Sequence, residues 1–365
     1  MNKKFSYKKM LAGVGVMTCC FSLTLGTMLP PKAEAYNIAG VLVKSAVQYQ
    51  YFNKQLNHYD NDGRHEYFAQ IEEKEGVNDD PTLNGILGNV MTRLSSSIAQ
   101  TDPSITEKPY NYFVNNQTTF NAFCTLGHNI SVNTGLFTLL NNNEDEIAVV
   151  VAHEMGHGQK GHPIKGYQKS VPLDVLTQLY NAQNQDGGSQ MVSGVIANYA
   201  TANGITKPQE WEADNLAFDY TTGAGYNPGA GAATWQKVIE KMGESSSSFV
   251  GEIFSPSDHP TSQARRDNYA KKLSAYSNNN VSVDNGTIKV KNNTLIKTTA
   301  TDSMSGVERS YLVAGNLAAV YHNNTTIPQA YAEDGVVKMG GQDIIAPNAD
   351  EPSADELVNI LNKIK

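Results

Sequence analysis

The sequence predicts an α+β protein: a mainly helical domain with a small edge sheet, followed by a β-rich C-terminal region with a terminal helix. Three observations predict this. Apolar residues within 38–51 and 83–98 recur at spacings of three and four, which is typical of helices. Residues 110–132 instead intersperse aromatic and β-branched residues with Asn and Thr, which indicates short strands. After residue 280 alternating runs replace the helical spacing, so we place a domain boundary there.

Composition and charge favour a globular protein that does not bind nucleic acid. The chain has 365 residues, of which 40% are hydrophobic and 18% charged, so it is long enough to bury a large core. The formal net charge is −8, from 28 basic and 36 acidic residues. Binding to nucleic acid depends on clustered Lys and Arg. The only basic cluster stands at the N-terminus.

The N-terminus has the pattern of a secretory signal peptide. Four lysines precede an apolar run over residues 11–29, and Ala33-Glu34-Ala35 provides small residues for cleavage after Ala35. The alternative is an uncleaved membrane anchor, since 19 residues can just span a bilayer, but Gly, Ser and Thr weaken the run. Cleavage leaves 23 basic and 35 acidic residues, a net charge of −12. Cys124 is then the only cysteine, so an exported chain has no internal disulfide.

The predicted helical domain, residues 36–280, follows this signal. Apolar spacing predicts helices over residues 38–51 and 83–98, before the strands of 110–132. The next helix is expected to run to about residue 158, because Asn143 can cap it with Glu146 three residues on, as in a capping box. Further helices are expected over residues 171–180, 208–220, 230–242 and 262–276, with polar loops over 184–190 and 245–248.

The C-terminal region, residues 281–365, begins with a predicted hairpin. Asn285 and Gly286 stand between alternating residues over 281–290, which is a strong turn signal. Strands are then expected over residues 317–321, 330–332 and 336–339, and a last helix over 354–364.

The pentad His153-Glu154-Met155-Gly156-His157 lies inside the predicted helix after Asn143. One turn separates the two histidines, so both imidazoles share a face and can take two corners of a tetrahedral zinc site, with Glu154 beside the metal. The alternative is a pair of exposed histidines beside a surface glutamate. The apolar residues of 147–152 make the helix apolar nearly all round, which favours a buried site.

A catalytic zinc usually takes three protein ligands and leaves the fourth position to water. In a metzincin the third ligand is a histidine six residues after the pentad, but Pro163 stands there and His162 is one residue short. The better candidate is Glu210, 53 residues after His157. On a helix Glu210 shares a face with Asp214, so Asp214 can accept a hydrogen bond from a ligand histidine.

The acidic cluster of residues 210–214 has a second interpretation, a charged and solvated helix face. The pentad favours metal ligation by Glu210 instead. Ala213 on the same side allows close helix packing, whereas Glu212 points elsewhere and is expected to be solvated.

Five short segments, in this order, resemble a known family: Asn121-Ala122-Phe123 with Gly127, Thr134-Gly135-Leu136 before residues 143–148, the zinc pentad, residues 210–214, and Asp258-His259-Pro260 with Arg265. Through them residues 111–273 resemble the gluzincin-type zinc peptidases related to the CAAX prenyl proteases and the HtpX-like and Oma-like enzymes, family forty-eight of the metallopeptidases. The resemblance implies His153, His157 and Glu210 as ligands of one zinc ion per chain, Glu154 as catalytic base, Asp214 as support of a ligand, and catalytic roles for His259 and Arg265.

The chain departs from the family pattern after Asn121-Ala122-Phe123. Family members often have Pro-Gly-Gly there, whereas this chain has residues 124–128, so a different loop and substrate groove are expected. Cys124 is interpreted as a small buried residue, with an inhibitory thiolate near the metal as the alternative. His128 is interpreted as a polar loop residue and not as a ligand.

These observations together predict a zinc endopeptidase of extended or misfolded polypeptides. Substrate would add a strand along residues 119–132, His259 or Arg265 would stabilise the oxyanion, and the loop 245–254 would cover the cleft. The resemblance favours the periplasm or cell envelope over full secretion, with peripheral association to the envelope. Two alternatives stay open: an envelope chaperone or assembly factor that grips polypeptides with little proteolysis, and a zinc enzyme that attacks cell-wall amides.

Overall fold

The computed structural model describes residues 38–182, 205–243 and 260–365. The chain divides into two units, residues 1–43 and 44–365, and the described part of the first is the start of one helix. The predicted signal peptide, the polar loops and His259 lie outside the described residues. Within the described ranges, the helices are all too short or too polar to cross a bilayer.

The helical part of the second unit confirms most of the predicted helices and adds four. The predicted helices α1 and α8 have shifted bounds, and α2, α4, α5 and α7 are additional. The helices are α1 (Ile38–Asp60), α2 (Arg64–Glu75), α3 (Pro81–Ala99), α4 (Ser104–Glu107), α5 (Thr134–Leu139), α6 (Glu144–Gln159), α7 (His162–Ser170), α8 (Leu173–Ala182), α10 (Lys207–Gly223), α11 (Ala230–Met242) and α12 (Ser262–Tyr276).

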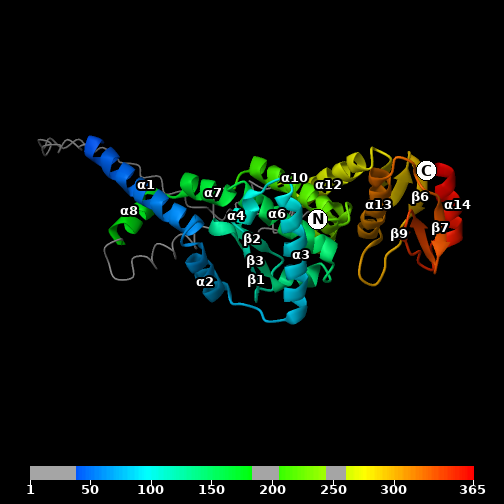
Figure 1. Ribbon diagram of the computed structural model, residues 1–365, viewed down its shortest axis with the longest axis horizontal. Helices are drawn as coiled ribbons and strands as arrows, with labels where there is room; N and C mark the ends of the chain where they lie inside the picture. Colours follow the sequence, from blue (N-terminus) through cyan, green and yellow to red (C-terminus); the bar gives the residue numbers. More distant parts are fainter. Residues whose placement is uncertain (1–37, 183–204, 244–259) are drawn as a thin grey trace, which may run out of the picture. The chain divides into compact units, whose positions relative to one another are not determined.

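A three-stranded sheet lies beside α6 (Figure 1). Its strands are β1 (Asn111–Asn115), β2 (Ala122–Thr125) and β3 (Asn129–Asn133), and their order is β1-β3-β2. β1 runs parallel to β3 and β2 runs antiparallel to it, so β2 is an edge strand. A short 3-10 turn, Leu126–His128, joins β2 to β3. The predicted strands within 110–132 are therefore confirmed.

Helix α6 is the centre of the helical part. Every residue from Glu146 to Gly158 is buried, and the helix packs on β2, β3, α3, α10 and α11. Asn143 caps it as predicted, because its side chain accepts a hydrogen bond from the Glu146 N–H at 3.3 Å. The prediction for the Glu146 side chain was wrong: its carboxyl accepts from the Asn143 side chain and pairs with Lys237 instead of closing a capping box on the backbone.

The C-terminal region contains two three-stranded antiparallel sheets and two helices. Figure 1 shows α13 and α14 on either side of these strands. The elements are β4 (Val281–Asp284), β5 (Thr287–Val290), β6 (Asn293–Lys297), α13 (Gly306–Asn323), β7 (Ala330–Glu333), β8 (Val336–Met339), β9 (Gln342–Ile345) and α14 (Ala354–Ile364). The predicted turn at Asn285-Gly286 is confirmed, and both residues have positive φ, as a tight hairpin turn requires.

The strand predicted over residues 317–321 was wrong, because these residues form the end of α13. Their apolar run is too short to distinguish a buried strand from a buried helix. Most of α13 is buried, since it packs on β4, β5, β9, α11 and α12. Because α13 has neighbours on several sides, its sequence lacks the amphipathic pattern by which a helix is usually recognised.

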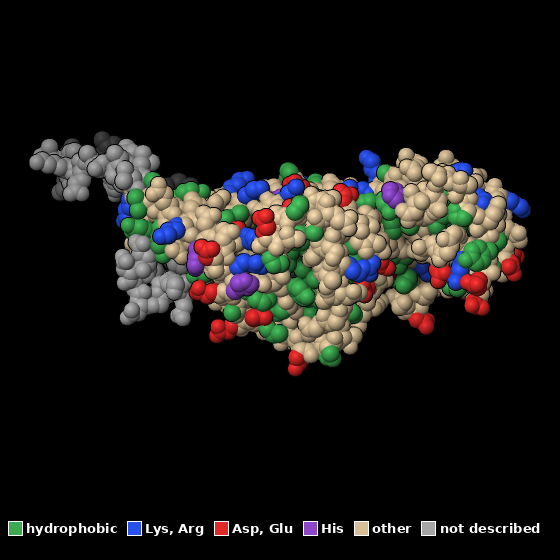
Figure 2. Space-filling model, in the orientation of Figure 1, with side chains coloured by type: hydrophobic (Ala, Val, Ile, Leu, Met, Phe, Trp, Pro, Cys, Tyr) green, Lys and Arg blue, Asp and Glu red, His purple; other side chains and the backbone are tan. Residues whose placement is uncertain are grey.

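Hydrophobic packing continues across residue 280. One cluster contains Leu94 and Val150 of the helical part together with Val281, Leu317 and Leu361 of the C-terminal region. The domain boundary stays a prediction, and hydrophobic contacts cross it. On the face seen in Figure 2, Lys and Arg side chains are interspersed with Asp and Glu instead of gathering in one stripe.

A buried ionic cluster also joins the two parts. Lys237 of α11 is 2% exposed, and its Nζ lies 3.1 Å from Glu146 Oε2 and 2.9 Å from Glu308 Oε1. One ammonium group thus faces two buried carboxyl groups. Burial raises the pKa of Glu146 to about 8, although Lys237 opposes the shift and Glu308 adds to it. The pair of carboxyls therefore holds a proton that an exposed glutamate would release.

This cluster predicts opposite behaviour for substitutions at Lys237 and Glu146. Lys237→Met leaves two buried carboxyls without their cation and is expected to reduce the free energy of unfolding by about 3 to 5 kcal/mol. Glu146→Gln keeps the shape and removes the surplus carboxyl, so it is expected to be tolerated. Because the folded-state pKa of Glu146 lies above its ordinary 4.5, its favourable contribution is complete below about pH 4.5 and is lost as pH rises through about 8.

Urea unfolding at pH 5 and pH 8 measures both effects. Glu146→Gln is expected to gain stability relative to the natural chain as pH rises, while the exposed control Glu73→Gln shows no such gain. A constant difference between the natural chain and Glu146→Gln across this pH range would contradict the assignment.

Candidate active site

The two pentad histidines and Glu210 converge on one point. On α6, His153 Nε2 and His157 Nε2 lie 3.0 Å apart. On α10, Glu210 places one carboxyl oxygen 3.5 Å from His153 Nε2 and the other 3.3 Å from His157 Nε2. All three side chains are buried, and their ligand atoms lie within 4.8 Å of one another. Two imidazoles and one carboxylate are a donor set of catalytic zinc sites, so these residues fit the metal.

Glu210 reaches the histidines because α6 and α10 approach closely. A Cβ atom on Gly156 would lie 3.2 Å from the Cα of Ala213, closer than nine in ten real contacts of this kind. The predicted close packing at Ala213 is thus confirmed. A capping box between Thr206 and Gln209, with Pro208 in the first turn, starts α10 so that Glu210 falls in this turn.

Asp214 and Arg265 support His153 from its other ring nitrogen. Asp214 Oδ1 lies 3.0 Å from His153 Nδ1. A histidine that presents Nε2 to a metal carries its proton on Nδ1 and can donate it to this carboxylate. Arg265 of α12 donates from Nε to Asp214 Oδ2 at 2.7 Å and from Nη2 to Oδ1, and its guanidinium stacks on Trp235. Arg265 therefore lies behind His153, on the side of Nδ1.

The charge of Arg265 keeps Asp214 ionised. Burial raises the pKa of Asp214, but the guanidinium and His153 outweigh burial and hold the pKa below its usual value. Burial and Arg265 lower the pKa of His153, yet its bonds to Asp214 and Glu210 raise it to about 9. Binding of a metal by this ring therefore competes with its protonation.

His162 and Glu212 support His157 in the same way, which the sequence interpretation missed. His162 Nδ1 lies 2.9 Å from His157 Nδ1, and His162 Nε2 lies 3.2 Å from Glu212 Oε2. Burial, and then the charge of His157, lower the pKa of His162 to about 4, so its ring is neutral. Glu212 is exposed, as expected, with 48% of its side-chain surface accessible, but its carboxylate also contacts His162. The available signal was Gly161, whose φ of 59° reverses the chain and returns His162 toward α6.

Glu154 lies beside the ligands and next to the edge strand β2. Its side chain is buried, and Oε2 accepts a hydrogen bond of 2.9 Å from the Cys124 N–H. Burial raises the pKa of Glu154, which suits a group that must take up a proton.

Cys124 and His128 have the roles predicted for the loop. Burial, and then the Glu154 charge, raise the pKa of the Cys124 thiol well above its usual value, so it is a small buried residue and not a thiolate. His128 Nδ1 lies 2.8 Å from the Lys108 carbonyl oxygen, and its ring stacks on Tyr110. His259 is outside the described residues, so its role stays a prediction. Two residues later Thr261 caps α12, which carries Arg265.

Comparison with known proteins relates the chain to metalloproteases. The metalloprotease LoiP of Escherichia coli strain K12 is 30% identical over 178 residues, which are 47% of this chain and 66% of LoiP. The beta-barrel assembly-enhancing protease of the same organism is 24% identical over 241 residues, or 63% of this chain and 47% of that protein. A mitochondrial metalloendopeptidase of Arabidopsis thaliana is 28% identical over 154 residues, or 41% and 29%. The chain thus spans at most about two thirds of these relatives.

The profile of Peptidase family M48 matches residues 84–272. The matched region is just over half of the chain and contains every candidate site residue from His153 to Arg265. This chain therefore belongs to Peptidase family M48.

Proposed function

We propose that this chain is a zinc-dependent endopeptidase that hydrolyses extended or misfolded polypeptides in the cell envelope. The observation that carries the proposal is the convergence of His153, His157 and Glu210 within 4.8 Å, with Glu154 of the same helix beside them. The family match and the metalloprotease relatives support it.

The chain's own residues have separate tasks in this reaction. His153 and His157 would hold one zinc ion through their Nε2 atoms, and Glu210 through its carboxylate. When bound, zinc polarises the scissile carbonyl and lowers the pKa of water toward ~7. Glu154 takes the proton of the attacking water and passes it to the leaving amine. The Cys124 N–H holds one oxygen of the Glu154 carboxylate in place for this transfer.

The proposed substrate path follows the edge strand β2. Within residues 119–132, β3 already pairs on both sides, whereas β2 pairs on one side. The Cys124 N–H donates to Glu154, so the open edge of β2 passes the proposed base. An extended polypeptide that adds to this edge would place its backbone near Glu154 through main-chain hydrogen bonds. Such binding selects weakly for sequence.

The contacts of Arg265 favour a positioning role over direct contact with the oxyanion. Its guanidinium is committed to Asp214 and lies at His153 Nδ1, away from the ring nitrogen that would face the metal. His259 therefore becomes the better proposed donor to the oxyanion, since it stands six residues before Arg265 and just before α12.

Export by the predicted signal peptide is part of the proposal. One relative is named both for assembly and for proteolysis, so the chaperone alternative is tested together with the peptidase. The same ligands would serve attack on cell-wall amides, and trials with such amides separate that alternative.

Glu154→Gln is expected to reduce cleavage of unfolded casein by about 10²- to 10⁴-fold, the usual contribution of an acid–base group. Its zinc content, measured by mass spectrometry of the purified protein, is expected to stay at one per chain because the three ligands remain.

The exposed control Glu73→Gln should cleave casein like the natural chain. Undiminished cleavage by Glu154→Gln would contradict the assignment of the base. Full biological activity of a Glu154→Gln variant that no longer cleaves would favour the chaperone.

His162→Leu removes both hydrogen bonds of the His162 ring and is expected to weaken zinc affinity by about 10- to 100-fold, since His157 loses the group that fixes its orientation. Competition with a chelator of known affinity measures the change. His65→Leu, on the exposed side of α2, is the matched control and should leave the affinity unchanged. Equal zinc affinity in His162→Leu and the natural chain would show that His162 does not orient the ligand.

A further inference from the structure

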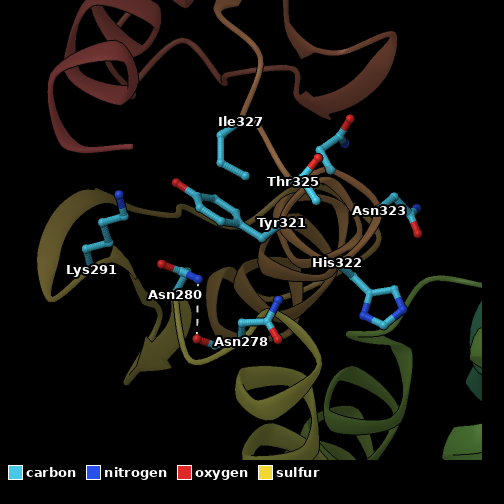
Figure 3. Close-up of a pocket in the computed structure, with 9 residues that line it drawn as sticks. Asn278, Asn280, Lys291, Tyr321, His322, Asn323, Thr325 and Ile327 are labelled. Carbon is cyan, nitrogen blue, oxygen red and sulfur yellow. Dashed lines mark hydrogen bonds between the residues drawn. The ribbon is translucent and has the colours of Figure 1, made fainter.

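A polar pocket of about 400 Å³ lies in the C-terminal region, and none of its lining residues belongs to the candidate active site (Figure 3). Residues 278 and 280 line it before β4, and Lys291 lines it from the turn between β5 and β6. Residues 321–325 and 327 line it from the end of α13 and the segment that follows. Its volume lies in the range of small-ligand sites, about 300 to 1,000 Å³.

The charge of this pocket contrasts with that of the whole chain. Acidic residues outnumber basic ones, 36 to 28, yet the lining contains no Asp or Glu. Asp284, the acidic residue of the β4–β5 hairpin, pairs with Lys289 at 2.8 Å, and the described residues include no ion-pair partner for Lys291. Figure 3 shows the His322 ring turned away from Lys291. The Lys291 ammonium therefore makes one side of the pocket suited to an anion.

Tyr321 contributes a buried hydroxyl group to the same side. The residue is 3% exposed, and within the described part of the chain its Oη has no hydrogen-bond partner. Burial raises the pKa of Tyr321 to about 12, so the group is an O–H donor at neutral pH. Figure 3 shows the hydroxyl pointing toward the side of Lys291. A buried donor of this kind is normally paired, so a ligand or water must complete it.

The backbone holds Lys291 and Asn280 together. Lys291 and Asn292 have φ of 46° and 67°, a left-handed conformation that non-glycine residues adopt uncommonly. The Lys291 N–H donates to the Asn280 carbonyl oxygen at 2.8 Å. The Asn280 side-chain amide donates to the Ser277 carbonyl oxygen, and its own oxygen faces the side of Lys291 and the Tyr321 hydroxyl (Figure 3). The pocket thus places an acceptor beside two donors.

We propose that this pocket binds the C-terminal carboxylate of a peptide. The carboxylate accepts hydrogen bonds from Lys291 Nζ and Tyr321 Oη, and the Asn280 side-chain oxygen accepts a peptide N–H. A volume of about 400 Å³ exceeds the needs of a lone acetate ion and favours a peptide end over a free small carboxylate. The site is independent of the proposed hydrolysis.

Calorimetric titration of the full chain tests the proposal with defined probes. Ala-Ala-Ala with a free carboxylate, the same tripeptide as its amide, and acetate are titrated into Glu154→Gln protein, which keeps the probes intact if the chain is a peptidase. The free acid is expected to bind about tenfold more tightly than the amide, since a hydrogen bond to a charged group is lost in the amide. Acetate is expected to bind more weakly than the free acid.

Tyr321→Phe and Lys291→Gln, each added to Glu154→Gln, are expected to weaken binding of the free acid about five- to tenfold. The matched controls Tyr331→Phe and Lys297→Gln, made in the same Glu154→Gln background, lie outside the pocket lining and should not change binding of the free acid. Equal melting temperatures of these variants exclude misfolding. Equal binding of acid and amide, or no effect of either pocket substitution, would overturn the proposal. Acetate binding as tight as that of the tripeptide would overturn the assignment to a peptide end.

Discussion

The close contact between α6 and α10 is the constraint on which the candidate site depends. The histidines of α6 form only half of a metal site, and Glu210 joins them because Gly156 lets Ala213 approach without a side chain between the helices. A larger residue at position 156 would separate the helices. The ligand set is therefore a consequence of helix packing as well as of residue type.

Each histidine is held at its second nitrogen by a buried partner. Asp214, one turn after Glu210, contacts His153 and is itself fixed by Arg265 of α12. His162 contacts His157 from the start of α7. Three helices besides α6 thus orient two imidazole rings, which is how proteins keep metal ligands in place before the metal arrives. The Lys237 cluster extends this support to the C-terminal region, because it ties α6 to α13.

The sequence predicts the parts of this structure whose signals are local. The histidine spacing, the Asn143 cap and the Asn285-Gly286 turn each depend on neighbouring residues, and all are found. Contacts between distant segments are not predictable in this way. The pairing of Glu146 with Lys237 requires knowledge of which helices meet. Glu212 is solvated, as helical periodicity predicts, but that periodicity says nothing of α7, which supplies the His162 ring that Glu212 contacts. The end of α13 was predicted as a strand because a helix buried on several sides has no polar face, and a short apolar run then fits a strand as well as a helix.

The central claim is that three residues on two helices bind one catalytic metal. Anomalous diffraction at the zinc edge, from crystals of the zinc-loaded chain, tests it most directly. The account predicts one peak about 2.0 to 2.2 Å from His153 Nε2, His157 Nε2 and a Glu210 oxygen, the usual range for zinc bound to nitrogen and oxygen. A zinc peak on other residues, with none between these three, would contradict it.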